Sequence, residues 1–488
     1  MSDCLPVELM DIILGHLHPE QWLVSWPNTA RNKLNLAACS LVSRRWNAVT
    51  RRHLFEDVVY SFRRVPADDE ASHEALTCEH DVYRRFSMGS VCEARYKTLR
   101  LFCQFLRSDE VARTSIRRLR LRVLPSARRI SSFGSTPRLD LCFDEQDRVE
   151  SAELVALFGL LPNLRVLHLS DIIPSTPSCA SWKTIRLRQL SIDFSSPFYQ
   201  LRDRNQYTTY SEYAVVQLLT FFGEVEDLQI ARVGFDHSSS YPILRSTQSS
   251  PLRVRSLTLC MTQSYRGCLL DSLTSSVTLP DLRRLVLKPH DLSAREVHLL
   301  QNALSPFSGN LLELKYDLSR TNFFHATVPV LDISRCNKLH QLNIGFRLDP
   351  HTRYTNIDTL RNIASFLSEA RISQTMNPQL RAITFEITFV FTLEENSNWQ
   401  LCCHEGMNAF DCAVSELASR YPILKLRFEY KTIGRFMSQS PADTIANMMS
   451  ITSQRVKLHI QAYGNSEHVH GNITRNSQPY EIGVDEFL

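Results

Sequence analysis

The sequence predicts an α+β protein in which a small helical module precedes an irregular α/β solenoid of parallel strands and outer helices. Apolar residues recur at helical spacing near the N-terminus. Farther along the chain, a short motif recurs in which apolar residues occupy the first, fourth and sixth positions. Amphipathic segments separate several copies of this motif. Because a helical segment follows several of the strand motifs, we expect parallel strands with helices on the outside.

Length and composition indicate several globular domains. The chain has 488 residues, of which 43% are hydrophobic and 22% charged, as is usual for folded proteins. The net charge of +4, from 55 basic and 51 acidic residues, argues against a nucleic-acid partner. We expect a helical module at 1–60, a connector at 61–110, the solenoid at 111–460 and a polar C-terminal tail at 461–488.

Cysteine usage and the N-terminus predict an intracellular protein. The 13 cysteines are odd in number and lack a repeated spacing, unlike a secreted disulfide scaffold. The N-terminus has neither a basic nor an apolar signal region, and no apolar run is long enough to cross a membrane. We therefore expect a cytoplasmic and/or nuclear protein with no membrane association.

No chemistry-bearing motif is present in the sequence. Phosphate-binding glycine loops and hydrolase motifs are absent. One cluster of possible metal ligands contains Cys402, Cys403, His404 and Cys412. Its spacing fits no standard zinc-binding motif, and Cys412 is expected on an apolar helix face, so both observations argue against a metal site. We expect no metal, no cofactor and no catalytic residue.

Two helices are expected at the N-terminus. Pro6 suits the first turn of a helix, and the apolar stripe that follows contains Leu9, Ile12, Ile13 and Leu17. A second helix is expected over about 35–50. A module this short buries little surface alone, so we expect a partner to cover part of its apolar surface. The bundle core is predicted to contain Leu9, Leu41 and Val49.

Three segments carry a family resemblance: Leu5-Pro6-x-Glu8-Leu9-x-x-x-Ile13-x-x-x-Leu17, Cys39-Ser40-Leu41-Val42-Ser43-Arg44-Arg45-Trp46 and Leu54-Phe55. Together they resemble the F-box, in the form common among fungal F-box proteins. The resemblance implies binding to a Skp-type adaptor and, through it, to a cullin. It assigns adaptor binding to Leu5, Pro6, Leu9, Ile13, Leu17, Val42, Trp46 and Leu54. The link between the helices, residues 20–33 with Trp22 and Trp26, is longer than usual, and it is either a loop beside the adaptor or a local prop.

The recurring motif has a regular spacing over part of the chain. Its middle apolar residue recurs at Leu228, Leu257, Leu285, Leu314 and Leu342, in steps of 29, 28, 29 and 28 residues. This period is typical of leucine-rich repeats. Wider steps elsewhere imply insertions or missed repeats. The repeats diverge from the usual leucine-rich-repeat pattern, because Ile172 and Thr262 replace the usual asparagine after the strand in two of them. Outer helices are expected at 152–161, 213–222, 294–304, 360–367 and 409–419.

The residues between the apolar positions of the motif point to the opposite face of each strand. In a curved solenoid that face is used for binding. The candidates for a target-binding face are Arg118, Arg120, Arg122, His168, Asp193, Asp227, Arg284, Lys288, Glu313, Lys315, Asp317 and Asn343. The three arginines suit a carboxylate or phosphate, but charged residues are also ordinary on a solvated strand face.

Taken together, the two resemblances imply a non-catalytic substrate-recognition subunit of an SCF-type cullin E3 ubiquitin ligase. Its F-box would bind the adaptor and its repeats an unknown target protein. Two alternatives stay open. One is an F-box scaffold with a non-degradative role, and the other is a repeat protein that binds peptide or RNA.

Overall fold

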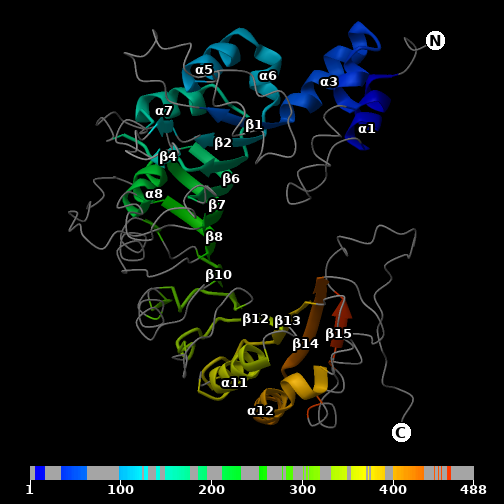
Figure 1. The fold of residues 1–488 in the computed structure, drawn as a ribbon, viewed down its shortest axis with the longest axis vertical. Coiled ribbons are helices and arrows are strands. Elements are labelled where there is room, and N and C mark those ends of the chain that lie inside the picture. The colour runs from blue at the N-terminus through cyan, green and yellow to red at the C-terminus, as the bar shows by residue number, and fades with distance from the viewer. Residues whose placement is uncertain are drawn as a thin grey trace, which may run out of the picture. The chain divides into compact units, whose positions relative to one another are not determined.

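A computed structural model describes the fold in two compact units, Met1–Val225 and Glu226–Leu488 (Figure 1). The structure describes residues 6–16, 35–62, 98–123, 126–129, 139–142, 149–175, 185–194, 211–231, 252–260, 277–278, 282–288, 301, 304–305, 307–318, 331–348, 353–369, 372, 375–390, 399–421, 423–433, 445, 449, 452 and 459–462. The segment 20–33 and the tail 461–488 therefore lie almost entirely outside the described residues.

The N-terminal module contains α1 (Val7–His16), a short helix over 35–40 and α3 (Arg44–Glu56). The single helix predicted over about 35–50 is wrong, because the chain turns at Leu41 and Val42 and begins a new helix after Ser43. Ser43 is the N-cap of α3, and its hydroxyl accepts a hydrogen bond from the Trp46 backbone N–H at 3.3 Å. This cap gives a physical reason for the serine, whereas the Trp46 side chain packs against the module core.

In the first unit, four parallel strands follow one another in the order β1 (Asp57–Phe62), β2 (Arg118–Val123), β5 (Val166–Ser170) and β6 (Ile185–Asp193). The middle residues of the motif pair in register, with Leu119 opposite Leu167 and Leu167 opposite Leu190. A separate antiparallel ribbon is formed by β3 (Ser126–Arg129) and β4 (Leu139–Cys142). The helices are α5 (Leu99–Ser108), α6 (Glu110–Ser115), α7 (Ser151–Gly159) and α8 (Ser211–Leu219).

The second unit continues the parallel pattern. Strand β7 (Phe222–Ala231) spans the boundary between the units. It is followed by β8 (Leu252–Cys260), β10 (Arg284–Lys288), β11 (Glu313–Asp317), β12 (Gln341–Leu348), β13 (Ala382–Val390), β14 (Lys425–Ile433) and β15 (His459–Ala462), with β9 (Val277–Thr278) beside β8. The regular step is confirmed as a structural register, because Leu257, Leu285, Leu314 and Leu342 lie opposite one another on successive strands.

Two long helices accompany the last strands, α11 (Arg353–Glu369) and α12 (Trp399–Arg420), which lie side by side (Figure 1). Their close approach explains Gly406, because a Cβ atom there would lie 2.9 Å from the Ile357 Cα. Aromatic rings fill the space between sheet and helix. Phe385 stacks on Phe428 with ring centroids 5.1 Å apart and meets Phe410 edge-on at 5.2 Å.

The mixed helix–strand fold and the parallel strands are thus as predicted, and the helices expected at 152–161, 213–222, 360–367 and 409–419 correspond to α7, α8, α11 and α12. Most of the helix expected at 294–304 lies outside the described residues. Strand β1 and helices α5 and α6 were not predicted. The division into module, connector, solenoid and tail stays a prediction.

No helix in the described ranges is both long and apolar enough to span a membrane.

The buried leucine rows predict a specific stability difference. Leu342 is fully buried on β12, whereas Ile423, at the first position of its motif, is 61% exposed. We expect Leu342→Ala to lower the free energy of unfolding by about 2–5 kcal/mol, because it leaves a cavity between packed neighbours. Ile423→Ala is the matched control and should change stability by less than about 1 kcal/mol. Urea denaturation of both variants measures this, and equal losses would contradict the assignment of the inward row.

Candidate binding surfaces

An exposed apolar surface lies on the N-terminal helices. Leu9 is 46% exposed, Leu41 86% and Val42 59%, and Ile12 and Ile13 are exposed as well. We call these five residues the helical apolar face. Large apolar side chains that gather on one small module in this way mark a site for another protein. The prediction that Leu9 and Leu41 belong to the core is wrong.

The core of the module is formed by the other side of the same helices. Met10, Leu14, Leu36 and Val49 are buried together, as was predicted for Val49. The residues that pack against this cluster are Val7, Cys39, Trp46 and Leu54. In α1 the inward positions are therefore Val7, Met10 and Leu14, and the predicted stripe of Leu9, Ile12 and Ile13 faces outward.

The residues assigned to adaptor binding fall into three groups. Pro6, Leu9, Ile13 and Val42 are exposed, so their side chains are available to a partner. Trp46 and Leu54 are partly buried against the module core, so they contribute to the packing of the module. Leu5 and Leu17 lie outside the described residues. The adaptor-binding role of each of these residues stays a prediction.

Contacts fix the module to the helices that follow it in the first unit. Arg51 of α3 forms an ion pair with Asp109, the N-cap of α6. The Phe55 ring lies 5.8 Å from that of Phe105, between centroids. Next along the chain, Tyr60 stacks on Phe102 at 4.2 Å, and burial raises the pKa of Tyr60 to about 12.

A comparison with known families identifies the N-terminal module. Residues 2–60 match a model of the F-box-like family. The chain carries an F-box-like domain. F-box-like domains typically act in protein–protein interaction by binding Skp-type adaptors, and the helical apolar face lies within the matched residues. A search of curated proteins finds no significant match to the chain.

The outward faces of the strands carry the residues predicted for target binding. In the first unit, alternate residues of β2 are buried, and Arg118, Arg120 and Arg122 point to the other face. The pairing register places Arg120 beside His168 and Arg122 beside Ser170. The structure thus brings these predicted residues together with Asp193, which pairs with Ser170 from β6.

The three arginines differ in their electrostatic surroundings. Arg118 forms an ion pair with the buried carboxylate of Asp57. Arg120 has no such partner in the part of the chain that the structure describes, and its pKa is lowered by burial and by Arg122, against the opposing effects of Asp193 and Asp171. Burial, together with Arg120, lowers the pKa of His168 to about 4, so His168 is neutral at pH 7.

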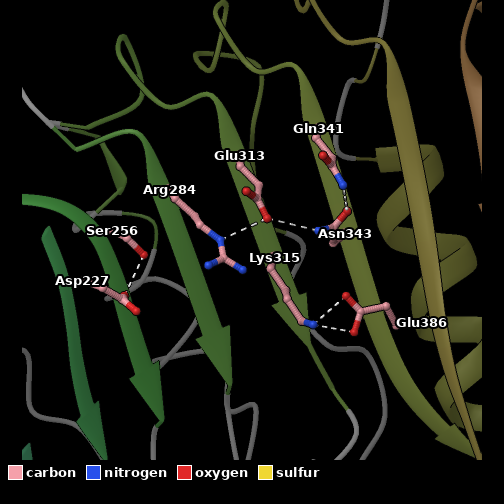
Figure 2. A network of polar contacts seen from close by, with 8 residues as sticks. All are labelled: Asp227, Ser256, Arg284, Glu313, Lys315, Gln341, Asn343 and Glu386. Atoms are coloured by element: carbon pink, nitrogen blue, oxygen red, sulfur yellow. Dashed lines mark hydrogen bonds and ion pairs between the residues drawn. The ribbon is translucent and has the colours of Figure 1, made fainter. Parts of the chain in front are cut away.

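In the second unit, the outward face is an internally paired polar network (Figure 2). Arg284 Nε lies 3.1 Å from Glu313 Oε1, and Asn343 Nδ2 donates to the same oxygen at 3.3 Å. The Gln341 amide donates to Asn343 Oδ1 at 2.9 Å, and Ser256 Oγ donates to Asp227 at 2.9 Å. These contacts use polar groups that would otherwise bind a ligand.

The lysines of this face are also paired. Lys315 donates to both carboxylate oxygens of Glu386, and Lys288 lies 3.8 Å from Asp317. Strand β12 lies between Lys315 and Glu386, where Gly345 presents no side chain. A Cβ atom at Gly345 would lie 3.0 Å from Asp317 Oδ1, so a larger residue would crowd this charge network.

The described part of the chain contains no group of three or more His, Cys, Asp and Glu side chains able to hold a metal ion. Cys412 of α12 is exposed, so its expected place on an apolar helix face is wrong.

The carboxylate of Glu429 on β14 predicts a pH-dependent stability. Its pKa is raised by burial and by Glu386, its neighbour on β13, while Lys315 and Arg427 oppose this shift. A raised pKa means that the folded state disfavours the ionised form, so the contribution of Glu429 to stability falls as the pH rises through its folded pKa. We expect Glu429→Gln to raise the free energy of unfolding at pH 7.

The gain should vanish toward about pH 3, below the ordinary glutamate pKa of about 4.3, where the carboxyl is protonated in both states. Urea denaturation across this pH range measures the difference. Asp358→Asn on α11, which replaces an exposed acid, is the control. A stabilisation that is equal at both ends of the pH range would contradict the interpretation.

Proposed function

We propose that this protein is a substrate-recognition subunit of an SCF-type cullin E3 ubiquitin ligase. The helical apolar face within the F-box-like residues carries the proposal. It would bind a Skp-type adaptor, and through that adaptor a cullin. The outward faces of the parallel strands would bind a target protein.

The arrangement of the strands supports a leucine-rich-repeat solenoid for the target-binding part. From Leu228 to Leu342 its motif recurs in steps of 28 or 29 residues, the middle leucines align in parallel register, and helices follow several strands. Each of these is a property of such repeats. Alternation along the strands then separates an inward apolar row from an outward polar row.

The proposed role needs no catalytic side chain. A receptor that holds its target near the transferring enzyme raises the effective concentration of the target's lysines. Ubiquitin transfer would be performed by partner proteins. A cytoplasmic and/or nuclear location stays a prediction that accompanies this role.

Charge substitutions on the helical apolar face test the adaptor half of the proposal. We expect Leu9→Lys combined with Val42→Lys to weaken binding to a Skp-type adaptor by more than about 10-fold, because buried lysines would have to lose their hydration at the interface. Both positions are exposed, so the fold should survive. Isothermal titration of purified adaptor into each protein measures the affinity.

A matched control is Leu101→Lys on α5, which replaces an equally large, 50% exposed leucine outside the matched residues. It should bind the adaptor as the parent does. If the double variant also binds normally, the helical apolar face is not the adaptor site.

A second experiment separates a ligase subunit from a non-degradative scaffold. A ligase subunit should capture a cullin, and the targets that it captures should accumulate when the chain is deleted.

A further inference from the structure

The outward face of the first unit contains a compact set of polar groups that have no partners among the described residues. Arg120 and Arg122 lie on β2, and His168 and Ser170 lie opposite them on β5. Neighbouring parallel strands are about 4.8 Å apart, and alternate residues on one strand about 6.6 Å apart. The four side chains therefore start from the corners of a small rectangle on one face of the sheet.

Two of these groups are buried without a hydrogen-bond partner. Ser170 is 5% exposed, and neither its Oγ nor the His168 Nε2 atom has a partner among the described residues. Leaving a buried hydroxyl or imidazole nitrogen unsatisfied is unfavourable by about 1–3 kcal/mol. Other buried side-chain atoms of the described residues, such as those of Thr50 and Gln217, also lack a hydrogen-bond partner, so an unsatisfied atom alone does not mark a site. Here two such atoms lie beside two arginines on one face of the sheet, which indicates a place where a ligand supplies the missing contacts.

The two arginines are also without ion-pair partners, which sets them apart from the other predicted cations. Arg118, Arg284, Lys288 and Lys315 each have a carboxylate within 4.0 Å. Within the described ranges, Arg120 and Arg122 have none. Arg120 is partly buried and lies near the like charge of Arg122. A bound anion would offset both the lost hydration and the repulsion.

The surrounding charge indicates which anion fits. Asp193, at the end of β6, and Asp171, which follows β5, also act on Arg120, so the positive charge of the two arginines is partly offset before a ligand binds. A doubly charged phosphate would leave the cluster strongly negative, whereas a carboxylate adds only one charge. The planar guanidinium also matches the two oxygens of a carboxylate.

We propose that Arg120, Arg122, His168 and Ser170 form a binding site for a carboxylate group. The carboxylate would belong to the bound target protein, as an acidic side chain or a chain terminus, and in this respect the inference rests on the proposed function. The arginines hold the two oxygens, and the Ser170 hydroxyl donates a further hydrogen bond. Neutral His168, in the tautomer that carries its proton on Nε2, donates another.

Ligand-dependent stabilisation of the full chain, purified with its adaptor, tests the site. A ligand that binds the folded state raises the melting temperature. The probes are N-acetylaspartate amide, which carries only a side-chain carboxylate, N-acetylalanine, which carries only a terminal one, and inorganic phosphate, each compared with chloride at equal ionic strength. We expect one or both carboxylates to raise the melting temperature more than phosphate does at pH 7.5, where most of the inorganic phosphate is doubly charged.

Arg120→Gln and Arg122→Gln should each abolish the carboxylate response without lowering the melting temperature in chloride, because neither arginine has a partner to lose. Arg186→Gln is the matched control, since Arg186 lies on β6 in the same unit, is 82% exposed and is 3.7 Å from Glu224. It should respond as the parent does. A response that survives in both site variants, a larger response to phosphate, or no response in the parent would overturn the inference.

Retention of the adaptor is measured in the same samples. Loss of the carboxylate response with the adaptor still bound would reject this site alone. A carboxylate response in a chain that does not bind the adaptor would instead reject the proposed ligase role.

Discussion

The parallel register of the motif's middle leucines is the constraint on which each unit depends. Leu257, Leu285, Leu314 and Leu342 lie opposite one another on adjacent strands and are almost fully buried. Because side chains alternate along a strand, a shift by one residue would move the whole apolar row to the solvent side. When the leucine row is buried, the residues that alternate with it along each strand must point to the outward face. The position of the proposed target-binding face therefore follows from the packing of the core.

The helical apolar face and the outward strand faces differ in the kind of side chain that they expose. The helical apolar face consists of side chains that the small N-terminal module has no room to bury. The outward strand faces consist of charged side chains, and most of the predicted cations there are already paired. A surface that is internally paired is preorganised and contributes shape and selectivity. The unpaired arginines of β2 stand out against that background.

Much of the strand pattern was predictable, because the spacing of buried leucines is dictated by local alternation and by the length of one repeat. Strand β1 was missed although Phe55-x-x-Val58-x-Tyr60 fits the motif, because Phe55 was assigned to the end of the helical module. In α1, apolar residues occupy two faces, and helical periodicity alone does not tell which face is covered. The break at Ser43 depends on a capping hydrogen bond that an apolar pattern does not report. The charge pairs, such as Lys315 with Glu386, join residues 71 positions apart, and only the fold brings them together.

The central claim is that one chain presents an adaptor-binding surface on its N-terminal helices and leaves its strand faces free for a target. Hydrogen–deuterium exchange of the full chain, with and without a Skp-type adaptor, tests this claim most directly. The account predicts slower amide exchange in α1 and over residues 35–56, with exchange in β2, β5 and β10–β14 unchanged. Unchanged exchange in the helices, or protection that appears instead in the strands, would contradict it.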